Sequence, residues 1–506
     1  MARLRRIAPR LLLVALALAP VGGGAAEPFA LESLRVPGRP VDAVAVEGWL
    51  LVASVQGTPP AERRWLVRYP PRGVTQRVTR LPVPQDVVAF DVGELSPEPG
   101  PEVALLSART VQIHAGARLA AVQSLALDPP LPLPPRTRAL SHLAMIGDWD
   151  GHGAAELLVP GRTGARLLGL DGRPPRALAA AVIAHYVTQD GPDELLDGWL
   201  RARITWPEII RGNDNGDPWP DLFAVDRFGM AIFHGSANGP PSQPSEGLVF
   251  KPFRPEEERR HRSTWQRGFV TDVDGDQRTD LVLHRSVGTM LHSRSRTVVR
   301  LNPGTGLAAS AAPAALLEST GAFATLGVVD LDGDGHKELV QTSVNFGIPQ
   351  LIRLLARRRV TAVLRVYQLD PQAQNGLRET FHTNLSYGID FEAARLRGIL
   401  PSLEGDWNGD GRRDLLYGDG PRRARIRLGT PGPTGPTFGP AGGPIPLPAG
   451  RGLLVMDADG DGLDDLVMWN ASDPDGRLWR LRNRGVLPAS VPVLRGARPQ
   501  DEASGE

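Results

Sequence analysis

Residues 268–285 read GFVTDVDGDQRTDLVLHR, which is an apolar run, an acidic loop and a second apolar run. Within the loop, acidic residues stand at positions 1, 3, 5 and 9, which are Asp272, Asp274, Asp276 and Asp280. Short runs of Val, Leu and Phe bounded by Gly and Asp are typical of β-strands. The stretch therefore predicts two strands joined by a loop in which four carboxylates gather.

The same loop recurs along the chain, each time between apolar runs. Three more copies are complete and a fifth carries asparagines; their residues at positions 1, 3, 5 and 9 are Asp330, Asp332, Asp334 and Glu338, then Asp406, Asn408, Asp410 and Asp414, then Asp457, Asp459, Asp461 and Asp465, and finally Asn213, Asn215, Asp217 and Asp221. A sixth, weaker copy has Asp148, Asp150 and Glu156 but places His152 at position 5. A seventh runs from Asp91 to Glu102 and is longer, so the seven copies begin 51 to 76 residues apart.

This repeat length indicates the architecture. A period near 60 residues is too long for leucine-rich or ankyrin repeats, and it fits one four-stranded propeller blade with its loops. We therefore predict an all-β protein in which residues 27–494 form a single β-propeller of seven or eight four-stranded blades. Residues 31–85 lack the acidic loop but read as strands. They form either a degenerate, metal-free eighth blade or, in part, a strand that completes the last of seven blades, and eight blades are favoured.

The longest repeat contains an element of a different kind, PQLIRLLARRRV at residues 349–360. Leu351, Leu354 and Leu355 are at helical spacing, and Arg357–Arg359 follow them. The pattern predicts a short amphipathic helix inserted in a loop. Such a helix either covers an exposed sheet edge or faces a partner, and the first interpretation is favoured.

The chain termini predict export and a free tail. Residues 1–10 are basic, residues 11–19 are apolar, and small residues precede Glu27, which together are typical of a signal peptide over residues 1–26 that is cleaved near Ala26. Nine apolar residues are too few to span a bilayer, which needs about 20. The mature chain is expected to lack a transmembrane segment and to be periplasmic or secreted. Residues 495–506 are polar and are expected to form a flexible tail.

The acidic loops have the chemistry of a hard-cation site. Calcium takes 6–8 oxygen ligands in irregular geometry, whereas magnesium demands a stricter octahedron. Carboxylates at positions 1, 3, 5 and 9 of one tight loop converge on a point, and packed carboxylates repel one another unless a cation neutralises them. We therefore predict about four or five calcium ions, with the loops at Asp91 and Asp148 as doubtful sites. The alternative is that these residues only form Asx turns.

Composition excludes several classes of function. The formal net charge is +1, which argues against nucleic-acid binding. The chain has no cysteine, so disulfides, thiolate metal sites and cysteine nucleophiles are excluded. The ten histidines show no H-E-x-x-H spacing, and no G-x-S-x-G or P-loop motif occurs.

The loop segments TDVDGDQRTDLVLHR, VVDLDGDGHKELVQTS, GDWNGDGRRDLLYGDG and MDADGDGLDDLVMWN resemble FG-GAP/VCBS repeats, the calcium-binding blades of integrin α-chain-type β-propellers. The resemblance covers about residues 86–490. The Phe-Gly and Gly-Ala-Pro signatures are mostly absent, so the VCBS-like form fits better. Membership of this family implies a propeller with calcium bound between the first two strands of a blade, but it does not imply a particular ligand.

The sequence favours a non-catalytic binding or adhesion scaffold whose propeller face takes an unknown protein or carbohydrate ligand. The alternative is a secreted carbohydrate-active enzyme, similar to a polysaccharide lyase, because some such enzymes resemble this propeller. Candidate side chains for that alternative are Tyr186, Tyr367, Tyr387, His382 and Arg357–Arg359.

Overall fold

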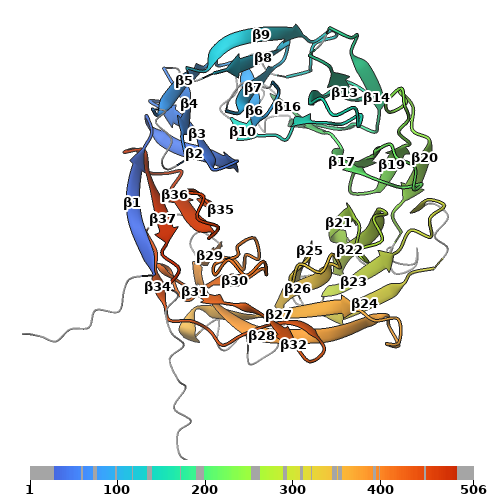
Figure 1. The fold of residues 1–506 in the computed structure, drawn as a ribbon, viewed down its shortest axis with the longest axis vertical. Coiled ribbons are helices and arrows are strands. Elements are labelled where there is room, and N and C mark those ends of the chain that lie inside the picture. Colours follow the sequence, from blue (N-terminus) through green and yellow to red (C-terminus); the bar gives the residue numbers. More distant parts are fainter. Residues whose placement is uncertain are drawn as a thin grey trace, which may run out of the picture.

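The computed structural model describes residues 28–486, apart from 59–60, 72–76, 97–99, 117, 134–139, 171, 190–198, 252–262, 289–292, 308–311, 321, 345–349, 351–355, 391–394, 398 and 449–451. These residues form an all-β propeller of eight blades arranged around a central axis (Figure 1). Eight blades, the favoured prediction, are thereby confirmed. The predicted signal peptide (1–26) and tail (495–506) lie outside the described residues.

The first four blades follow one another in chain order. Blade 1 contains β2 (Arg39–Val46), β3 (Trp49–Gln56), β4 (Arg63–Tyr69) and β5 (Thr79–Val83); blade 2 contains β6 (Val87–Gly93), β7 (Glu102–Ser107), β8 (Thr110–Ala115) and β9 (Ala120–Ala126); blade 3 contains β11 (Ile146–Gly147), β12 (Glu156–Pro160), β13 (Gly164–Leu168) and β14 (Arg176–Ala179); blade 4 contains β17 (Glu208–Gly212), β18 (Asp221–Val225), β19 (Gly229–Phe233) and β20 (Glu246–Val249). Within each of these blades the four strands pair antiparallel.

The last four blades complete the ring. Blade 5 contains β21 (Ser263–Thr271), β22 (Asp280–Gly288), β23 (Ser293–Arg300) and β24 (Ala315–Thr320); blade 6 contains β25 (Ala322–Val329), β26 (Glu338–Val344), β27 (Arg359–Leu369), β28 (Leu377–Asp390) and β29 (Arg395–Arg397); blade 7 contains β30 (Leu415–Gly418), β31 (Arg423–Arg427) and β34 (Ile445–Pro446); blade 8 contains β35 (Gly452–Met456), β36 (Asp465–Trp469), β37 (Arg477–Asn483) and β1 (Phe29–Arg35). In blade 7 the innermost place is taken by residues around Ser402, which form an isolated bridge to Leu416.

The first strand of the chain closes the ring. β1 pairs antiparallel with β37, from Phe29 opposite Asn483 to Arg35 opposite Arg477. The start of the segment 31–85 therefore completes the last blade, while its remainder forms all of blade 1. The sequence analysis linked such a strand exchange to a ring of seven blades. In the structure, β1 completes the last blade of a ring of eight.

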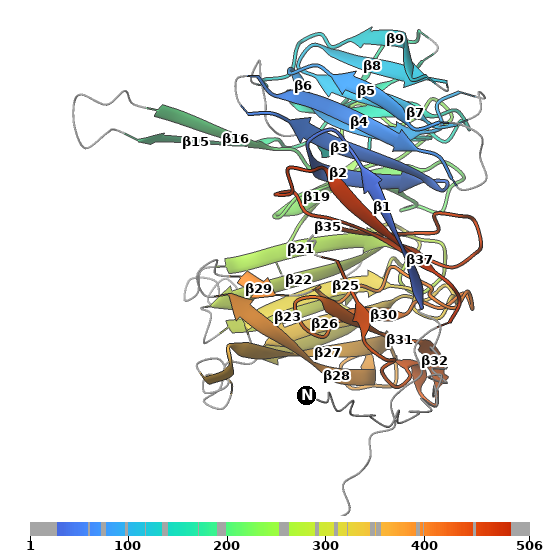
Figure 2. The same cartoon turned by 90° about the vertical axis from the view of Figure 1, so that its left-hand side faces the viewer.

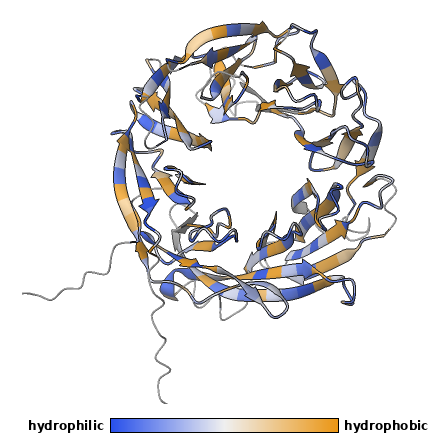
Figure 3. Cartoon of the chain, in the orientation of Figure 1, coloured by the Kyte–Doolittle hydropathy of each residue, from blue (hydrophilic) through white to orange (hydrophobic). Residues whose placement is uncertain are grey.

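The core lies between the blades, because each sheet packs face to face on its neighbours. The second strand of a blade is buried on both faces, and β7, β18 and β36 have no exposed residue. Leu51 of blade 1 packs with Leu105 of blade 2, and Leu416 of blade 7 packs with Leu466 of blade 8. Apolar and polar residues alternate along many strands (Figure 3), as expected for sheets whose inter-blade faces are filled by side chains.

Three elements depart from a regular ring. The hairpin of β15 (Ile183–Gln189) and β16 (Trp199–Thr205) projects away from the blades (Figure 2). The hairpin of β32 (Gly429–Gly432) and β33 (Gly435–Phe438) lies beside blade 6, where Phe438 meets Phe381 edge to face. β10 (Ser141–His142) pairs in parallel with β6 on the inner edge of blade 2.

The predicted helix over residues 349–360 is visible only in part. Gln350, Ala356 and Arg357 are helical, and the residues between them lie outside the described part of the chain. No helix among the described residues has the length and apolar character needed to cross a membrane.

Candidate metal centres

The acidic loops occupy equivalent places in successive blades, between the first strand and the second. The loops at residues 148–156, 213–221, 272–280, 330–338 and 457–465 join β11 to β12, β17 to β18, β21 to β22, β25 to β26 and β35 to β36. The loop at residues 406–414 enters β30 from the segment around Ser402. All six therefore lie on the same side of the ring.

Four of these loops bring three carboxylates to one point. In each of them, one oxygen from every residue lies within 4.8 Å of the others; the groups are Asp272, Asp274 and Asp276; Asp330, Asp332 and Glu338; Asp457, Asp459 and Asp461; and Asp148, Asp150 and Glu156. Three of the four predicted positions therefore converge in blades 5, 6 and 8: position 9 is absent from the group in blades 5 and 8, and position 5 is absent in blade 6. The weaker blade 3 loop also brings three carboxylates together.

The loops of blades 4 and 7 are different, because asparagines replace carboxylates. Asn215 donates an amide N–H to Asp217 at 2.9 Å, and Asn408 does the same to Asp410 at 3.0 Å. An amide that donates to its neighbour lowers the repulsion within the loop. These two loops carry a smaller negative charge to be neutralised.

The position 1 aspartate orders the turn. In the blade 6 loop, the carboxylate of Asp330 accepts the backbone N–H groups of Gly333 at 2.7 Å and Gly335 at 3.0 Å. Asp272, Asp406 and Asp457 make the same pair of bonds in their loops. Glycine at positions 4 and 6 suits this turn because both places have positive φ. These bonds are the Asx turns that the sequence offered as the alternative to metal, so they do not by themselves indicate an ion.

The position 9 carboxylate is buried and clamps the loop. Asp280 is 1% exposed, and its two oxygens accept N–H bonds from Val273 and Asn302, both at 2.8 Å. Glu338 is fully buried and accepts an N–H bond from Leu331 at 2.9 Å. Burial raises the pKa of Asp280 to about 6 and that of Glu338 to about 8, and the neighbouring acidic groups add to the rise.

Within the described part of the chain, several buried carboxylate oxygens in these loops have no hydrogen-bond donor. They are Asp332 Oδ1 and Glu338 Oε1 in blade 6, Asp465 Oδ2 in blade 8 and Asp148 Oδ1 in blade 3. Buried polar atoms are nearly always paired in native proteins, and exceptions often indicate a water or ion. Oxygen-only groups of this kind are the ligands that calcium prefers. The residues present therefore fit a hard divalent cation.

The blade 3 loop already carries cations of its own. His152 Nδ1 lies 2.8 Å from Asp150 Oδ1, and this hydrogen bond raises the pKa of the imidazole. Arg173 lies 4.0 Å from Asp150, and Arg211 lies 3.6 Å from Asp148. Two guanidinium groups and a histidine therefore face the three carboxylates, which leaves less charge for a metal to neutralise than in blades 5, 6 and 8.

The structure corrects the predicted start of the blade 2 loop. Asp91 lies inside β6, opposite Ala104 of β7, and its buried carboxylate accepts bonds from the backbone N–H groups of Met145 at 2.6 Å and Ile146 at 2.7 Å. The loop itself follows Gly93, and Glu102 closes it by accepting the backbone N–H of Leu95 at 2.8 Å, the bond that Asp280 accepts from Val273 in blade 5. Asp91 is therefore a carboxylate held by protein donors and not a position of the loop.

Neighbouring loops are hydrogen bonded to one another from blade 4 to blade 8. The residue at position 8 of each loop donates its backbone N–H to position 1 or 2 of the preceding loop: Thr279 to Asn213 (2.7 Å), Lys337 to Val273 (2.8 Å), Arg413 to Leu331 (2.9 Å) and Asp464 to Asp406 (3.1 Å). Position 8 of the blade 4 loop is Pro220, which has no N–H to give to the blade 3 loop. The loops of blades 4 to 8 thus form one continuous arc.

Two asparagines that the sequence analysis missed hold this arc together. Asn302 follows the third strand of blade 5, and Asn483 is the last residue of the third strand of blade 8. Each donates its side-chain N–H across the blade interface, to the carbonyl of Asp214 at 2.7 Å and that of Trp407 at 2.8 Å. Their backbone N–H groups also bond the position 9 aspartates of their own blades. Both precede a glycine by two residues, so aligning the third strands would have revealed them.

The candidate residues for catalysis do not converge. Tyr387 is buried in the core between blades 6 and 7, whereas Tyr367 packs in the core between blades 5 and 6, so their side chains lie on opposite faces of one sheet. His382 is exposed and lies 2.8 Å from Glu379. Arg359 bonds Ser386 on the neighbouring strand. The side chain of Tyr186 lies outside the described residues.

Comparison with solved structures finds distant likenesses. The WD40 domain of SCAP from fission yeast is 11% identical with a TM-score of 0.29, and the match covers 91% of this chain and 96% of that chain. The V. cholerae biofilm matrix protein Bap1 is 12% identical with a TM-score of 0.28, and the match covers 89% of this chain and 88% of that chain. No curated protein sequence matches the chain significantly.

Comparison with protein families finds one repeat family in two segments of the chain. Residues 272–340 and 406–468 each match the FG-GAP-like repeat. The first match begins at the blade 5 loop and continues through the blade 6 loop, and the second spans the loops of blades 7 and 8. The recurrent loops and the observed architecture agree with this match, and the chain is therefore a β-propeller that carries FG-GAP-like repeats.

Proposed function

We propose that this protein is a calcium-stabilised, non-catalytic propeller that works outside the cytoplasm as a binding or adhesion scaffold. The observation that carries the proposal is the set of buried carboxylate oxygens without donors inside the recurrent acidic loops. The FG-GAP-like match supports it, because such repeats often bind calcium. Export is proposed from the sequence of residues 1–26 alone.

The ion would be held by positions 1, 3 and 5 in blades 5 and 8, where blade 5 supplies Asp272, Asp274 and Asp276. In blade 6 the longer side chain of Glu338 takes part with positions 1 and 3. The oxygens of Asp280, at the same position in blade 5, are engaged by backbone donors. A bound calcium ion would supply positive charge among desolvated carboxylates, and its role would be structural.

Calcium stoichiometry tests the metal proposal. Equilibrium dialysis of residues 27–506 followed by atomic emission should find about four or five ions per chain. The double variant Asp274→Ala, Asp276→Ala should lose one ion. The matched control Asp475→Ala changes an exposed aspartate in the turn before β37 and should lose none. No retained calcium in the unaltered protein would overturn the proposal.

Turnover assays test the non-catalytic role. Incubation with a panel of acidic polysaccharides should release no product over many hours. Steady release of unsaturated or reducing ends would overturn the scaffold interpretation in favour of the carbohydrate-active alternative.

A further inference from the structure

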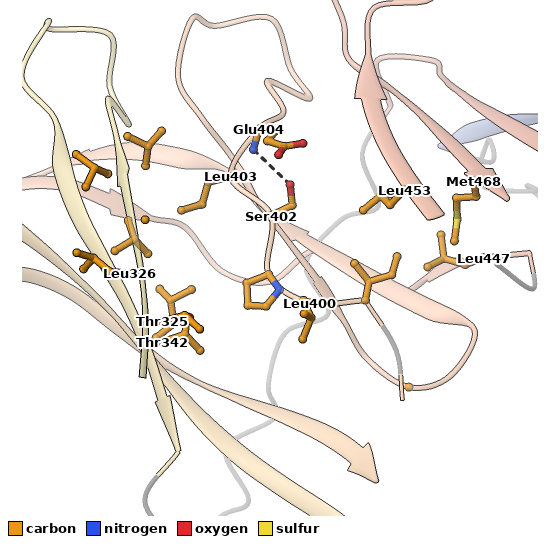
Figure 4. A pocket seen from close by; sticks show the side chains of 18 of the residues that line it. Thr325, Leu326, Thr342, Leu400, Ser402, Leu403, Glu404, Leu447, Leu453 and Met468 are labelled. Atoms are coloured by element: carbon orange, nitrogen blue, oxygen red, sulfur yellow. Dashed lines mark hydrogen bonds between the residues drawn. The ribbon is translucent and has the colours of Figure 1, made fainter. Parts of the chain in front are cut away.

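A cavity of about 1080 Å³ lies where blades 6, 7 and 8 face the central axis. In Figure 4, Thr325 and Leu326 of blade 6 lie on one side and Leu447, Leu453 and Met468 of blades 7 and 8 lie on the other. The segment 399–404 of blade 7 runs between them. Among the described residues, no residue of an acidic loop lines the cavity, but the lining residues Val329 and Glu404 lie one and two residues before the loops at 330–338 and 406–414.

The cavity exists because blade 7 lacks a regular innermost strand. The segment around Ser402 takes that place without forming a regular strand. Ser402 bonds Leu416 at 2.9 and 3.0 Å, Gly418 donates to the carbonyl of Ile399 at 3.1 Å, and Asp414 donates to that of Gly405 at 2.8 Å. Pro401 has no N–H, and a proline within such a segment interrupts the ladder. The irregular segment leaves the neighbouring inner edge of blade 6 uncovered.

That inner edge belongs to β25. Five consecutive residues of this strand, 325–329, line the cavity. Val340, Thr342 and Leu364 of the next two strands also line the cavity, so it borders the inner edge of β25 and extends over one face of blade 6. Within the described residues, no strand pairs with this edge of β25. An unpaired edge offers a row of N–H and C=O groups to an added strand.

Blade 2 of the same protein provides a precedent. There β10 adds a strand to the inner edge of β6, with Ser141 opposite Ala89 and His142 opposite Phe90. The space around the central axis therefore accommodates a fifth strand on the inside of a blade. At blade 6 the equivalent edge borders the cavity instead.

The lining defines what such a strand would carry. Leu400 is 59% exposed, and with Leu403 and Leu453 it makes much of the wall apolar. Glu404 is an exposed carboxylate in the lining, and no lysine or arginine lines the cavity among the described residues. An apolar site with one acidic group is complementary to an apolar segment that carries one basic residue.

We propose that β25 and the segment 399–404 form a docking site for an extended peptide segment of a partner protein. The segment adds a strand to the inner edge of blade 6, places alternate apolar side chains against Leu400 and Leu453, and sets one basic residue beside Glu404. This inference rests on the proposed binding-scaffold function and names the class of partner.

The test uses a phage-displayed library of random 12-residue linear peptides, selected on calcium-saturated protein of residues 27–506. Enriched peptides should alternate apolar residues around one Lys or Arg. The synthetic peptide should bind at least tenfold more weakly to the variants Leu400→Arg and Glu404→Lys. The matched control Leu31→Arg changes a side chain that is 64% exposed on β1 and should bind normally.

Two further readouts separate strand addition from nonspecific adhesion. Two peptides are compared, one methylated on the odd-numbered backbone amides and one on the even-numbered amides. Only one of them should lose binding, because an added strand donates every second N–H to its partner. Replacing the basic residue by Glu should restore binding to Glu404→Lys. No enrichment, or binding that is unchanged in Leu400→Arg and Glu404→Lys, would overturn the proposal. The calcium dependence of unfolding is measured on the same samples. Stabilisation by calcium without peptide binding would contradict the docking site alone, whereas no stabilisation by calcium would contradict the proposed scaffold.

Discussion

Glu338 offers a test in which one substitution raises the stability of the calcium-free protein and lowers its affinity for calcium. Its side chain is fully buried, one oxygen accepts the N–H of Leu331, and the other faces Asp330 and Asp332 without a donor. Burial and the neighbouring aspartates raise its pKa from 4.5 to about 8. In the calcium-free protein this residue is therefore a destabilising group, and with calcium it is a ligand.

The magnitude follows from the pKa. At pH 7.5 the unfolded chain ionises Glu338 freely, whereas the folded, calcium-free protein holds most of it protonated, a difference that costs about 4 kcal/mol at most. The substitution Glu338→Gln removes this cost and keeps an oxygen for the N–H of Leu331. An unfolding entropy of about 2.1 cal/mol/K per residue amounts to roughly 1 kcal/mol/K for the ring, so the melting temperature in EGTA should rise by about 1 to 4 °C.

With calcium the gain in stability becomes smaller. The variant loses one anionic ligand, and calcium affinity depends on ligand charge, so affinity at this site should fall at least tenfold, or about 1.4 kcal/mol. Differential scanning calorimetry in EGTA and in calcium measures both effects. The control Glu208→Gln changes an exposed residue of β17 and should alter neither. A lower melting temperature of Glu338→Gln in EGTA, together with an unchanged calcium effect, would refute this reasoning.

Four further outcomes are expected. Folding raises the pKa of Glu338 to about 8 and that of Asp465 to about 7. Such a carboxyl contributes its full stability below the unfolded pKa and loses it as pH rises through the folded pKa. The melting temperature in EGTA should therefore fall from about pH 6.5 to about pH 8.5, and calcium should make this fall smaller. Gln277 has φ 68° at loop position 6, where the loops of blades 3, 6, 7 and 8 have glycine, so Gln277→Gly should stabilise by up to about 1 kcal/mol in urea unfolding, and destabilisation would contradict the strain argument. Phe29 is buried with its ring 6.0 Å from that of Trp407, so Phe29→Ala should cost about 3 kcal/mol or more in the same assay, and a negligible loss would contradict its role in closing the ring. Lys337→Pro removes the backbone N–H that the blade 6 loop donates to Val273 of the blade 5 loop, whereas Lys337→Ala keeps it. Calorimetric titration should show weaker coupling between the calcium sites of these two loops only in the proline variant. Equal coupling in both variants would contradict the linked arc.

The elements that the sequence predicted are those governed by local spacing. Asp272, Asp274 and Asp276 lie within five residues of one another, so a single tight turn brings them together and the spacing alone foretold it. The propeller followed from the recurrence of that turn with flanking strands. The count of eight blades followed from the repeat length.

The elements that the sequence did not reveal depend on contacts between distant residues. Asn302 reaches Asp214 across 88 positions of the chain, and Asn483 reaches Trp407 across 76. The positive groups around the blade 3 loop come from Arg173 and Arg211, which no loop pattern connects to Asp148. The cavity beside β25 exists because one strand of the next blade is irregular, and a repeat pattern does not record such an irregularity.

The central claim is that the acidic loops are calcium sites that stabilise the native ring. The most direct measurement is thermal unfolding of residues 27–506 in excess calcium and in excess EGTA, with the bound metal counted on the same sample. Binding to the native state alone must raise the melting temperature. We predict a clear rise that accompanies about four or five calcium ions per chain. An identical melting temperature with no bound calcium would mean that the loops are Asx turns only, and it would contradict the claim.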